Sequence, residues 1–337
     1  MRNVSQIFKW QEIEQSFRDS LLLGNGASIA VDPCFTYCSL LQVAKDKHLI
    51  TNDIKKIFDY LDTQDFELVL NMIWHTFHVN KSLGVQDTIT ERVYGDIKTS
   101  LIEAIQANHA KYETVQEDLP KIGAFMHRFD KVISLNYDLI VYWALLLWND
   151  TYGPWFKDCW INNKFLSEID KLDSPYKNAQ GRTLVFYPHG NLVLASELNQ
   201  EETKITKTCK EELLKQIITK WENDTCVPLF VSEGNWQQKE SAIKRSHYLT
   251  TIFQNVISKL GPSLVIYGWT MSENDLHILK QLGKAQITRV AISIYRIGKS
   301  DSEIVEECRK YEYNIKTYLP DATLHFFDST SSGCWNN

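Results

Sequence analysis

The chain has 337 residues, of which 44% are hydrophobic, so it is long enough to bury one large core or two modest ones. Its formal net charge of −6 is spread over interleaved acidic and basic residues, which argues against direct binding of nucleic acid. No stretch approaches the roughly 20 apolar residues of a membrane span, and the charged N-terminal segment lacks the apolar core of a secretory signal, so we expect a cytoplasmic protein without a membrane partner.

Seven short runs of aliphatic and β-branched residues, each bounded by turn residues, predict β-strands. They cover residues 20–26, 131–136, 183–187, 227–232, 263–268, 289–295 and 322–327. Helical patterns separate the later runs, as at 240–260 and 303–315. Because strands that alternate with helices form parallel sheets covered on both faces, we predict a Rossmann-like α/β fold with a doubly wound, mostly parallel sheet.

Two long segments interrupt this alternation. Residues of about 36–127 show helical periodicity with almost no strand signal, and we interpret them as a large helical insertion into a single domain spanning 1–337. Residues of about 149–182 are rich in Trp, Asn, Asp and Lys and predict an irregular excursion near the site. The tail at 329–337 is expected to fray.

The first candidate site follows the first predicted strand. It is a glycine-containing turn made by Gly24, Asn25, Gly26, Ala27 and Ser28. Glycine lets the backbone turn tightly and approach a pyrophosphate, whose charge the following amides can face. A dehydrogenase fingerprint would have its third glycine where Ile29 stands, and no strand ending in an acid follows about 20 residues later, so hydride-transfer dehydrogenases are disfavoured. A tight turn without a ligand is the alternative.

Two further candidates lie at predicted strand ends. Asn136 and Asp138 provide an amide and a carboxylate at the sheet edge where ligands bind in open α/β folds. Either residue equally suits the cap of the next helix. His189 follows the strand at 183–187, and its titration near neutral pH suits a general base. A hairpin turn without a function would explain the same histidine.

Small hydroxyl residues and a glycine follow two later strands. Ser232 ends the run 227–232, while Gly268 and Thr270 follow the next one, where backbone and hydroxyl donors can meet a nucleotide. Ser272 or Asn274 equally suits the cap of the following helix, and we prefer the cap for those two.

The cysteines predict no metal site. They number seven and lie far apart, which indicates reduced thiols instead of a disulfide framework. Cys34 and Cys38 form a close pair, but no second pair exists to complete a tetrahedral zinc site. We therefore expect no metal.

Taken in chain order, these motifs resemble those of the Sir2 family, and more closely a Sir2-like group of bacterial proteins that includes the DUF4917 type of domain. The Gly-Ala-Gly-Ala-Ser turn of that family is similar to Gly24–Ser28, and its Gln-Asn-Ile-Asp segment is similar to Leu135–Asp138. Its His-Gly looks like His189–Gly190, and its later Gly-x-Ser looks like Gly268–Thr270 with threonine in place of serine. The resemblance leaves the helical insertion unmatched.

Two departures from sirtuins are informative. The chain has no CxxC pair and so lacks the four-cysteine zinc ribbon of the family. His189 also lies about fifty residues beyond Asn136, much further than in deacylating sirtuins. Both departures resemble the Sir2-like NAD-hydrolysing effectors of bacterial antiviral defence.

The resemblance implies that NAD is the substrate and lies with its pyrophosphate over Gly24–Ser28. Asn136 would then position the ribose and a water, His189 would act as general base, and Asp138 would bind a ribose hydroxyl or offset developing positive charge. The products would be nicotinamide and ADP-ribose. A catalytically silent nucleotide sensor and an NAD-dependent protein deacylase stay open as alternatives.

An enzyme that depletes NAD must be controlled. We expect control through a homo-oligomer or a separate regulatory protein. The helical insertion would serve as a contact surface or as a lid.

Overall fold

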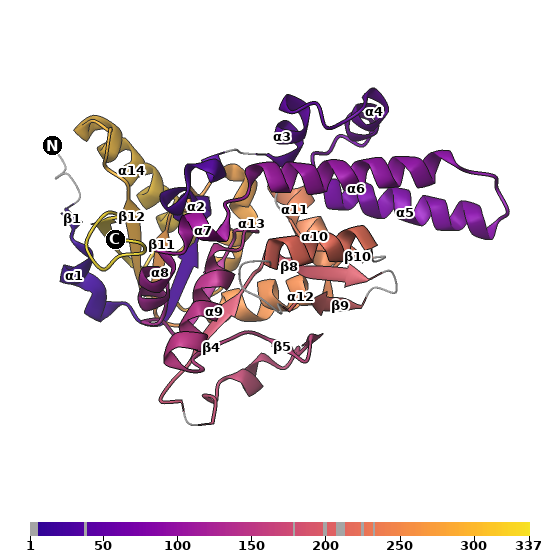
Figure 1. Ribbon diagram of the computed structural model, residues 1–337. Coiled ribbons are helices and arrows are strands. Elements are labelled where there is room, and N and C mark those ends of the chain that lie inside the picture. Colours follow the sequence, from indigo (N-terminus) through magenta and orange to yellow (C-terminus); the bar gives the residue numbers. More distant parts are fainter. Residues whose placement is uncertain are drawn as a thin grey trace.

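A computed structural model describes residues 6–36, 39–177, 179–197, 201–206, 213–223, 226–231 and 233–337. Its centre is an eight-stranded sheet in which every strand pairs in parallel with its neighbours (Figure 1). Across the sheet the strands are β1 (Ile7–Phe8), β13 (Thr323–Asp328), β12 (Arg289–Ile294), β11 (Ser263–Tyr267), β2 (Ser20–Leu23), β3 (Lys131–Ser134), β7 (Thr183–Phe186) and β4 (Phe156–Lys157). The predicted Rossmann-like α/β fold with a mostly parallel sheet is confirmed.

The central strands are short apolar runs because both of their faces are covered. β2 and β11 are buried at every residue, and β3 at all but its first. In the register, Leu21 aligns with Val132 and Val265 on one face of the sheet. The next residue, Leu22, aligns with Ile133 and Ile266 on the opposite face, so aliphatic side chains cover both faces. This continuous burial explains why these strands are visible in the sequence as short aliphatic and β-branched runs bounded by turn residues.

The order of the strands reverses between β2 and β11. From β2 the sheet extends in one direction through β3, β7 and β4, and from β11 it extends in the other direction through β12 and β13. Right-handed crossovers that run in opposite directions place their helices on opposite faces of the sheet. The junction of β2 and β11 is therefore a topological switch point, and the carboxyl ends of strands at such a point are where open α/β sheets bind ligands.

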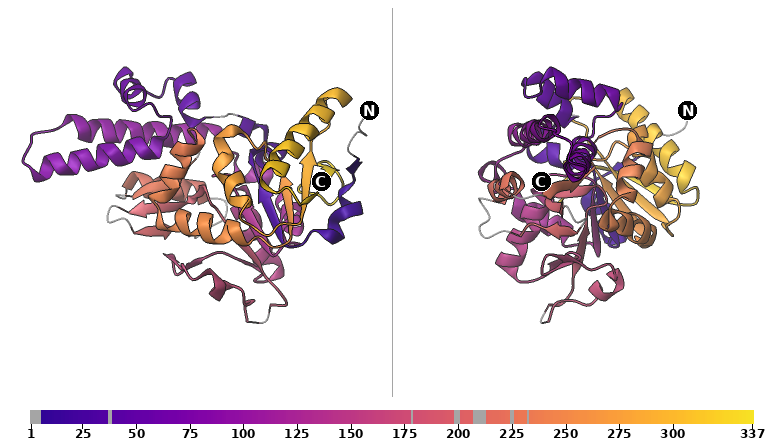
Figure 2. Two further views of the ribbon diagram at one scale, coloured as in Figure 1. Left: turned by 180° about the vertical axis from the view of Figure 1, so that it is seen from behind. Right: turned by 90° about the vertical axis from the view of Figure 1, so that its right-hand side faces the viewer.

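Helices cover the sheet on both sides, as Figure 2 shows in its right-hand view. α8 (Leu119–Met126) packs on α9 (Ile140–Tyr152), and α13 (Leu276–Leu282) packs on α14 (Asp301–Tyr318). The shorter helices are α1 (Trp10–Ile13), α2 (Asn25–Val31), α7 (Tyr112–Val115), α10 (Leu213–Asn223), α11 (Trp236–Lys244) and α12 (His247–Thr251). A π-helical turn (Ile252–Val256) continues α12, and short 3₁₀ turns occur at Glu14–Ser16, Pro33–Thr36, Ile169–Leu172, Ile257–Lys259 and Glu273–Asp275.

A second, antiparallel sheet was not expected. Its strands, in order, are β10 (Cys226–Phe230), β8 (Gly190–Glu197), β9 (Glu202–Lys204), β6 (Lys164–Phe165) and β5 (Trp160–Ile161). The run predicted as 227–232 is thus a strand, but it pairs with β8 outside the parallel sheet. A short buried apolar run looks the same in either kind of sheet, which is why its sequence did not distinguish them. The segment 149–182 is also more ordered than predicted, because it supplies β4, β5 and β6.

The long segment between β2 and β3 is helical, as its periodicity predicted. It contains α3 (Leu40–Asp46), α4 (Asn52–Tyr60), α5 (Phe66–Ser82) and α6 (Ile89–Asn108) before α7 and α8. The side chains of Ser39, Thr51 and Asp65 cap the first three of these helices. α5 and α6 form a hairpin that packs on β10 and extends beyond the rest of the chain (Figure 1).

The C-terminal tail is folded, contrary to the expectation that it frays. Trp335 is 1% exposed, its indole N–H donates to the Ala27 carbonyl, and its ring lies against Phe125 and Tyr267. The free energy gained by burying this one large aromatic side chain outweighs the tendency of the small polar residues around it to fray. Among the described residues, no helix combines the length and apolarity needed to cross a membrane.

Candidate functional site

A pocket of about 390 Å³ lies at the carboxyl ends of β2, β3, β7 and β11. Eight of the predicted site residues line it, namely Gly24, Asn25, Gly26, Asn136, Asp138, His189, Gly268 and Thr270. Ala27 and Ser28 lie just behind its wall and are buried. Ser232 lies outside the described residues. Loops that are far apart in the sequence thus meet at the switch point of the sheet.

The glycines of this pocket are required by a close contact between two loops. A Cβ atom on Gly24 would lie 2.6 Å from the Trp269 Cα, and one on Gly26 would lie 2.8 Å from the Gly268 Cα. Gly268 itself has a φ of +67°. The Gly26 amide donates to the Gly268 carbonyl and the Ala27 amide to the Gly24 carbonyl, so both are already engaged. The glycine pattern therefore reflects loop packing as well as any approach to a ligand.

Asn136 is held in one orientation by a buried network. Its side-chain Nδ2 donates to the Gly24 carbonyl and to the Ser28 Oγ, at 2.9 Å in each case. The Ser28 hydroxyl donates in turn to the Asp138 Oδ2 at 2.5 Å. A backbone carbonyl can only accept, so the amide nitrogen of Asn136 must face Gly24. None of the described residues donates to the Asn136 Oδ1, which leaves this oxygen as a free acceptor on the pocket wall.

Asp138 supports this network from behind. Its Oδ1 accepts from the Ile140 N–H at 2.9 Å, which is the first amide of α9, although Leu139 holds the N-cap position. Asn136 makes no such bond to α9. Burial raises the pKa of Asp138, although His109 and the Ser28 hydroxyl act in the opposite direction. Burial lowers the pKa of His109, whose Nε2 accepts from the Leu139 N–H. The carboxylate therefore contacts protein donors through both oxygens.

His189 lies in the turn that connects the parallel sheet to the antiparallel sheet. β7 belongs to the parallel sheet and β8 to the antiparallel one, so the turn between them is not a hairpin. Gly190 makes this turn with a φ of +76°, and a Cβ there would lie 2.1 Å from the Leu229 carbonyl oxygen. Burial lowers the pKa of His189 to about 4, and the nearby Lys239 acts in the same direction. The imidazole is therefore neutral at pH 7.

Sequence reasoning missed three polar residues beside His189. The Nε2 of His277 lies 2.8 Å from the Nε2 of His189. Asp275 accepts from the Lys239 Nζ at 2.8 Å and from the Trp269 Nε1 at 3.1 Å. Asp275 and His277 lie at the start of α13, directly after a segment where the sequence drew attention to possible caps. His277 is 88 residues from His189 in the sequence, so no local pattern connects the two histidines.

The helix caps predicted near α13 are not made by side chains. Ser272 is at the N-cap position of the 3₁₀ turn Glu273–Asp275, but its hydroxyl makes no capping hydrogen bond. Asn274 lies within that turn, so it is not a cap either. Asp275 precedes α13 and uses its carboxylate for Lys239 and Trp269 instead.

Glu233 joins the pocket to the helical segment. Its Oε1 accepts from the Leu40 N–H, and its Oε2 accepts from the Ser39 hydroxyl at 2.9 Å. The carboxyl group is thus docked on the N-terminus of α3, where the helix dipole favours negative charge. Burial nevertheless raises the pKa of Glu233 to about 7, against the effect of these hydrogen bonds.

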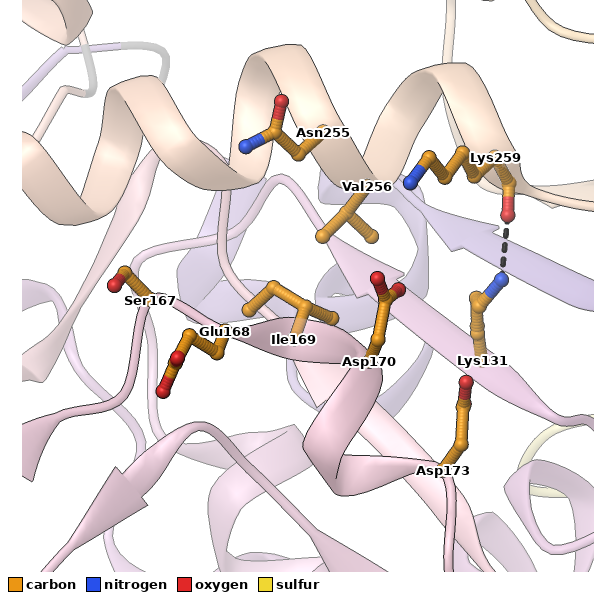
Figure 3. Close-up of a pocket in the computed structure, with 9 residues that line it drawn as sticks. All are labelled: Lys131, Ser167, Glu168, Ile169, Asp170, Asp173, Asn255, Val256 and Lys259. Carbon is orange, nitrogen blue, oxygen red and sulfur yellow. Dashed lines mark hydrogen bonds between the residues drawn. The ribbon is translucent and has the colours of Figure 1, made fainter.

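A second pocket, of about 280 Å³, lies at the opposite end of the sheet, where β3 begins (Figure 3). Its lining includes Lys131, Glu168, Asp170 and Asp173, and the three acids are exposed. The Lys131 Nζ donates to the Lys259 carbonyl, the one hydrogen bond drawn between these residues in Figure 3. This pocket therefore lacks the buried polar network of the first.

Comparison with known proteins identifies the family of this chain. A search of curated proteins found no relative of this chain. A family profile described as a domain of unknown function, DUF4917, matches residues 21–335. This match includes β2, the strand ends that form the carboxyl-end pocket, and most of the C-terminal tail. The chain therefore belongs to the DUF4917 family.

Proposed function

We propose that this protein is a Sir2-like NAD hydrolase that cleaves the bond between nicotinamide and ribose. The observation that carries the proposal is the convergence of Asn136, His189 and the two glycine loops on one pocket at the switch point. These are the motifs on which the resemblance to Sir2-like proteins rests. The volume of about 390 Å³ is within the range of about 300 to 1,000 Å³ typical of ligand sites.

In the proposed reaction, a water oxygen forms a bond to the anomeric carbon of the ribose. The carbon–nitrogen bond to nicotinamide breaks, and its electron pair neutralises the positively charged ring as nicotinamide leaves. His189 takes the proton of the water, directly or through a ribose hydroxyl, because it is neutral at pH 7. The products are nicotinamide, ADP-ribose and a proton.

Asn136 is suited to hold the ribose or the attacking water. Its amide nitrogen is committed to Gly24 and Ser28, so its Oδ1 is presented to the pocket without freedom to flip. An oriented acceptor of this kind contributes by fixing the geometry of the reacting groups. Asp138 then acts through Ser28 to hold Asn136, a more indirect role than the contact with a ribose hydroxyl predicted from the sequence.

The charges of the pocket suit a substrate that becomes more positive at its ribose. Three acids line it, and the one lysine in the lining is paired with Asp275. The pKa values of Asp138 and Glu233 are raised, so these two are protonated more readily than free carboxyl groups. The pocket thus accepts a pyrophosphate without strong repulsion and still offers polar groups to an oxocarbenium-like transition state.

The test is release of nicotinamide and ADP-ribose from NAD by the purified protein and by Asn136→Ala and His189→Ala. We expect each substitution to lower kcat at least about 100-fold, the usual contribution of a positioned acid–base group. Asn255→Ala in the amino-end pocket is the matched control and should keep wild-type turnover. Tight NAD binding without turnover would favour the silent sensor, and turnover that needs an acyl-lysine peptide would favour the deacylase.

The biological role belongs to the same proposal. An unregulated enzyme of this kind would deplete the NAD of its own cell, which fits an effector of antiviral defence held inactive by self-assembly or by a partner protein. The hairpin of α5 and α6 projects from the domain and is the proposed contact surface (Figure 1).

A further inference from the structure

His277 faces the candidate base His189 head-on. Their Nε2 atoms are 2.8 Å apart, and their ring centroids are 5.0 Å apart. The distance between the ring centroids is about the sum of the nitrogen–nitrogen distance and the distance from each ring centre to its own Nε2. Both nitrogens therefore lie on the line between the two ring centres. One proton must therefore lie between them, since two lone pairs or two N–H groups at this distance would repel each other.

This geometry favours a hydrogen bond over a shared metal ion. His189, Asp275 and His277 do bring three potential ligand atoms within 4.8 Å of one another. Two histidines that bind one cation aim their nitrogens at a common third point, whereas these two aim at each other. Both oxygens of Asp275 already accept hydrogen bonds, one of them from the Lys239 ammonium, which would repel a cation.

The neighbours of the two rings decide which histidine donates. The buried Nδ1 of His277 has no partner among the described residues. A proton on this nitrogen would leave a buried N–H donor unsatisfied, whereas a bare lone pair is less costly to leave unpaired. His277 therefore carries its proton on Nε2 and donates to the Nε2 lone pair of His189, so the proton of the neutral His189 ring lies on Nδ1.

We propose that His277 masks the basic nitrogen of His189 until a ligand separates the two rings. This inference rests on the proposed function, because it concerns the atom of His189 that would take the proton. In the structure the His189 lone pair accepts from the His277 N–H. A water or ribose hydroxyl bound with NAD must replace that donor before His189 can act as a base. His277 is thus a positioning residue that sets the availability of the base.

The charged groups around this pair are fixed by the fold. Lys239 and Glu240 on α11 and Asp275 before α13 face His277, and Lys239 and Asp275 also face His189. Lys239 and Asp275 are ion-paired with each other, so their opposite charges partly cancel at both rings. Removal of the hydrogen bond from His277 should therefore have the most direct effect on the pKa of His189.

The test is ¹⁵N NMR of histidine-labelled protein without NAD, with the His189 signals assigned by His189→Gln. In the wild type we expect the Nδ1–H tautomer of His189 at pH 7. His277→Phe keeps the ring contact with Phe253 and removes the donor, so the pKa of His189 should rise by about one unit. His277→Gln restores an N–H donor and should bring the pKa back toward the wild-type value.

His325→Phe is the matched control. His325 is another partly buried histidine with an unpartnered Nδ1, but it lies on β13 and should leave His189 unchanged. An Nε2–H tautomer of His189, or an unchanged His189 titration in His277→Phe, would overturn the proposal. Stoichiometric Zn²⁺ binding that His277→Phe abolishes would overturn it in favour of a metal centre.

Kinetics add a readout that separates this inference from the proposed function. If the protein hydrolyses NAD, His277→Phe should raise kcat/KM up to about tenfold and move the acidic limb of the pH profile with the pKa of His189, because a general base loses activity when it is protonated. If no variant turns over NAD, the proposed function fails, yet the NMR titration still decides whether His277 masks His189.

Discussion

The two ends of the parallel sheet carry pockets of similar size and opposite construction. At the carboxyl end the polar side chains of Asn136, Asp138 and His189 are buried, and each is hydrogen-bonded to a residue of another loop or helix. At the amino end the side chains of Glu168, Asp170 and their neighbours are exposed to solvent (Figure 3). Both ends are lined by acids, amides and lysines, so composition does not distinguish them.

The difference lies in what fixes the polar groups. Exposed charges are screened by water, and their ion pairs contribute about 1 kcal/mol or less. Buried groups must find partners, because an unsatisfied one costs about 1 to 3 kcal/mol. A pocket walled by buried, satisfied groups is therefore preorganised, and this is what a site needs to hold a substrate in a reactive geometry. Three pairs of variants test that view, and two of them compare the two ends directly.

The largest effect is expected where the two glycine loops touch. Gly268→Ala would place a Cβ 2.3 Å from the Ala27 nitrogen at a φ of +67°, so we expect at least about 3 kcal/mol of destabilisation. Gly298→Ala is the matched control, since its φ is +78° but no atom lies within 4 Å of the added Cβ. It should cost about 1 kcal/mol.

Urea unfolding followed by circular dichroism measures both changes. Equal losses for Gly268→Ala and Gly298→Ala would mean that backbone strain alone matters. In that case the contact between the loops after β2 and β11 would not be what fixes this end of the sheet.

An intermediate effect is expected from Ser28→Ala. Ser28 links Asn136 to Asp138, and its loss leaves a buried carboxylate oxygen without its donor, at a cost of about 1 to 3 kcal/mol. The Asn136 amide keeps only its bond to Gly24, so NAD hydrolysis should fall about tenfold. Ser167→Ala at the exposed amino-end pocket is the matched control and should change stability by less than about 0.5 kcal/mol.

Thermal unfolding and the NAD assay, run on both serine variants, check this prediction. A loss of stability without a loss of turnover would show that Ser28 supports the fold but does not orient Asn136. Equal effects at the two ends would remove the distinction between a buried network and an exposed one.

The sequence predicted the parallel sheet and the placement of the main motifs because both depend on local patterns. Apolar runs buried on both faces are readable as strands, and the residues after them necessarily reach one edge of the sheet. Asn136, His189 and Gly268 were found in this way, and the structure lines one pocket with all three.

The rest depended on long-range contacts that no local pattern records. β10 leaves the parallel sheet because it pairs with β8, and Trp335 orders the tail because it reaches Ala27 across the whole chain. His277 lies 88 residues beyond His189 and looks like an ordinary core residue of α13. His277 is singled out only by its short distance to His189, and a local sequence pattern cannot predict the distance between two residues so far apart in the chain.

The smallest effect is expected from Glu233→Gln and concerns pH. Burial raises the pKa of Glu233 to about 7, so the folded protein holds a proton that the unfolded chain loses near pH 4.5. The free energy of unfolding contributed by this group therefore falls as pH rises from about 4.5 to 7. Glutamine cannot titrate, so the variant should lack this slope, which is at most about 1.4 kcal/mol for each pH unit within the window.

Urea unfolding at several pH values measures the slope, with Glu168→Gln at the exposed amino-end pocket as the control that should keep it. Glutamine retains an oxygen that can accept from the Leu40 N–H, so the cap on α3 survives and the proton is the main change. If Glu233→Gln keeps the wild-type slope, the carboxyl group is ionised in the folded state. The docking of α3 beside the pocket would then involve a full negative charge, and the pocket would repel the pyrophosphate of NAD more strongly than proposed.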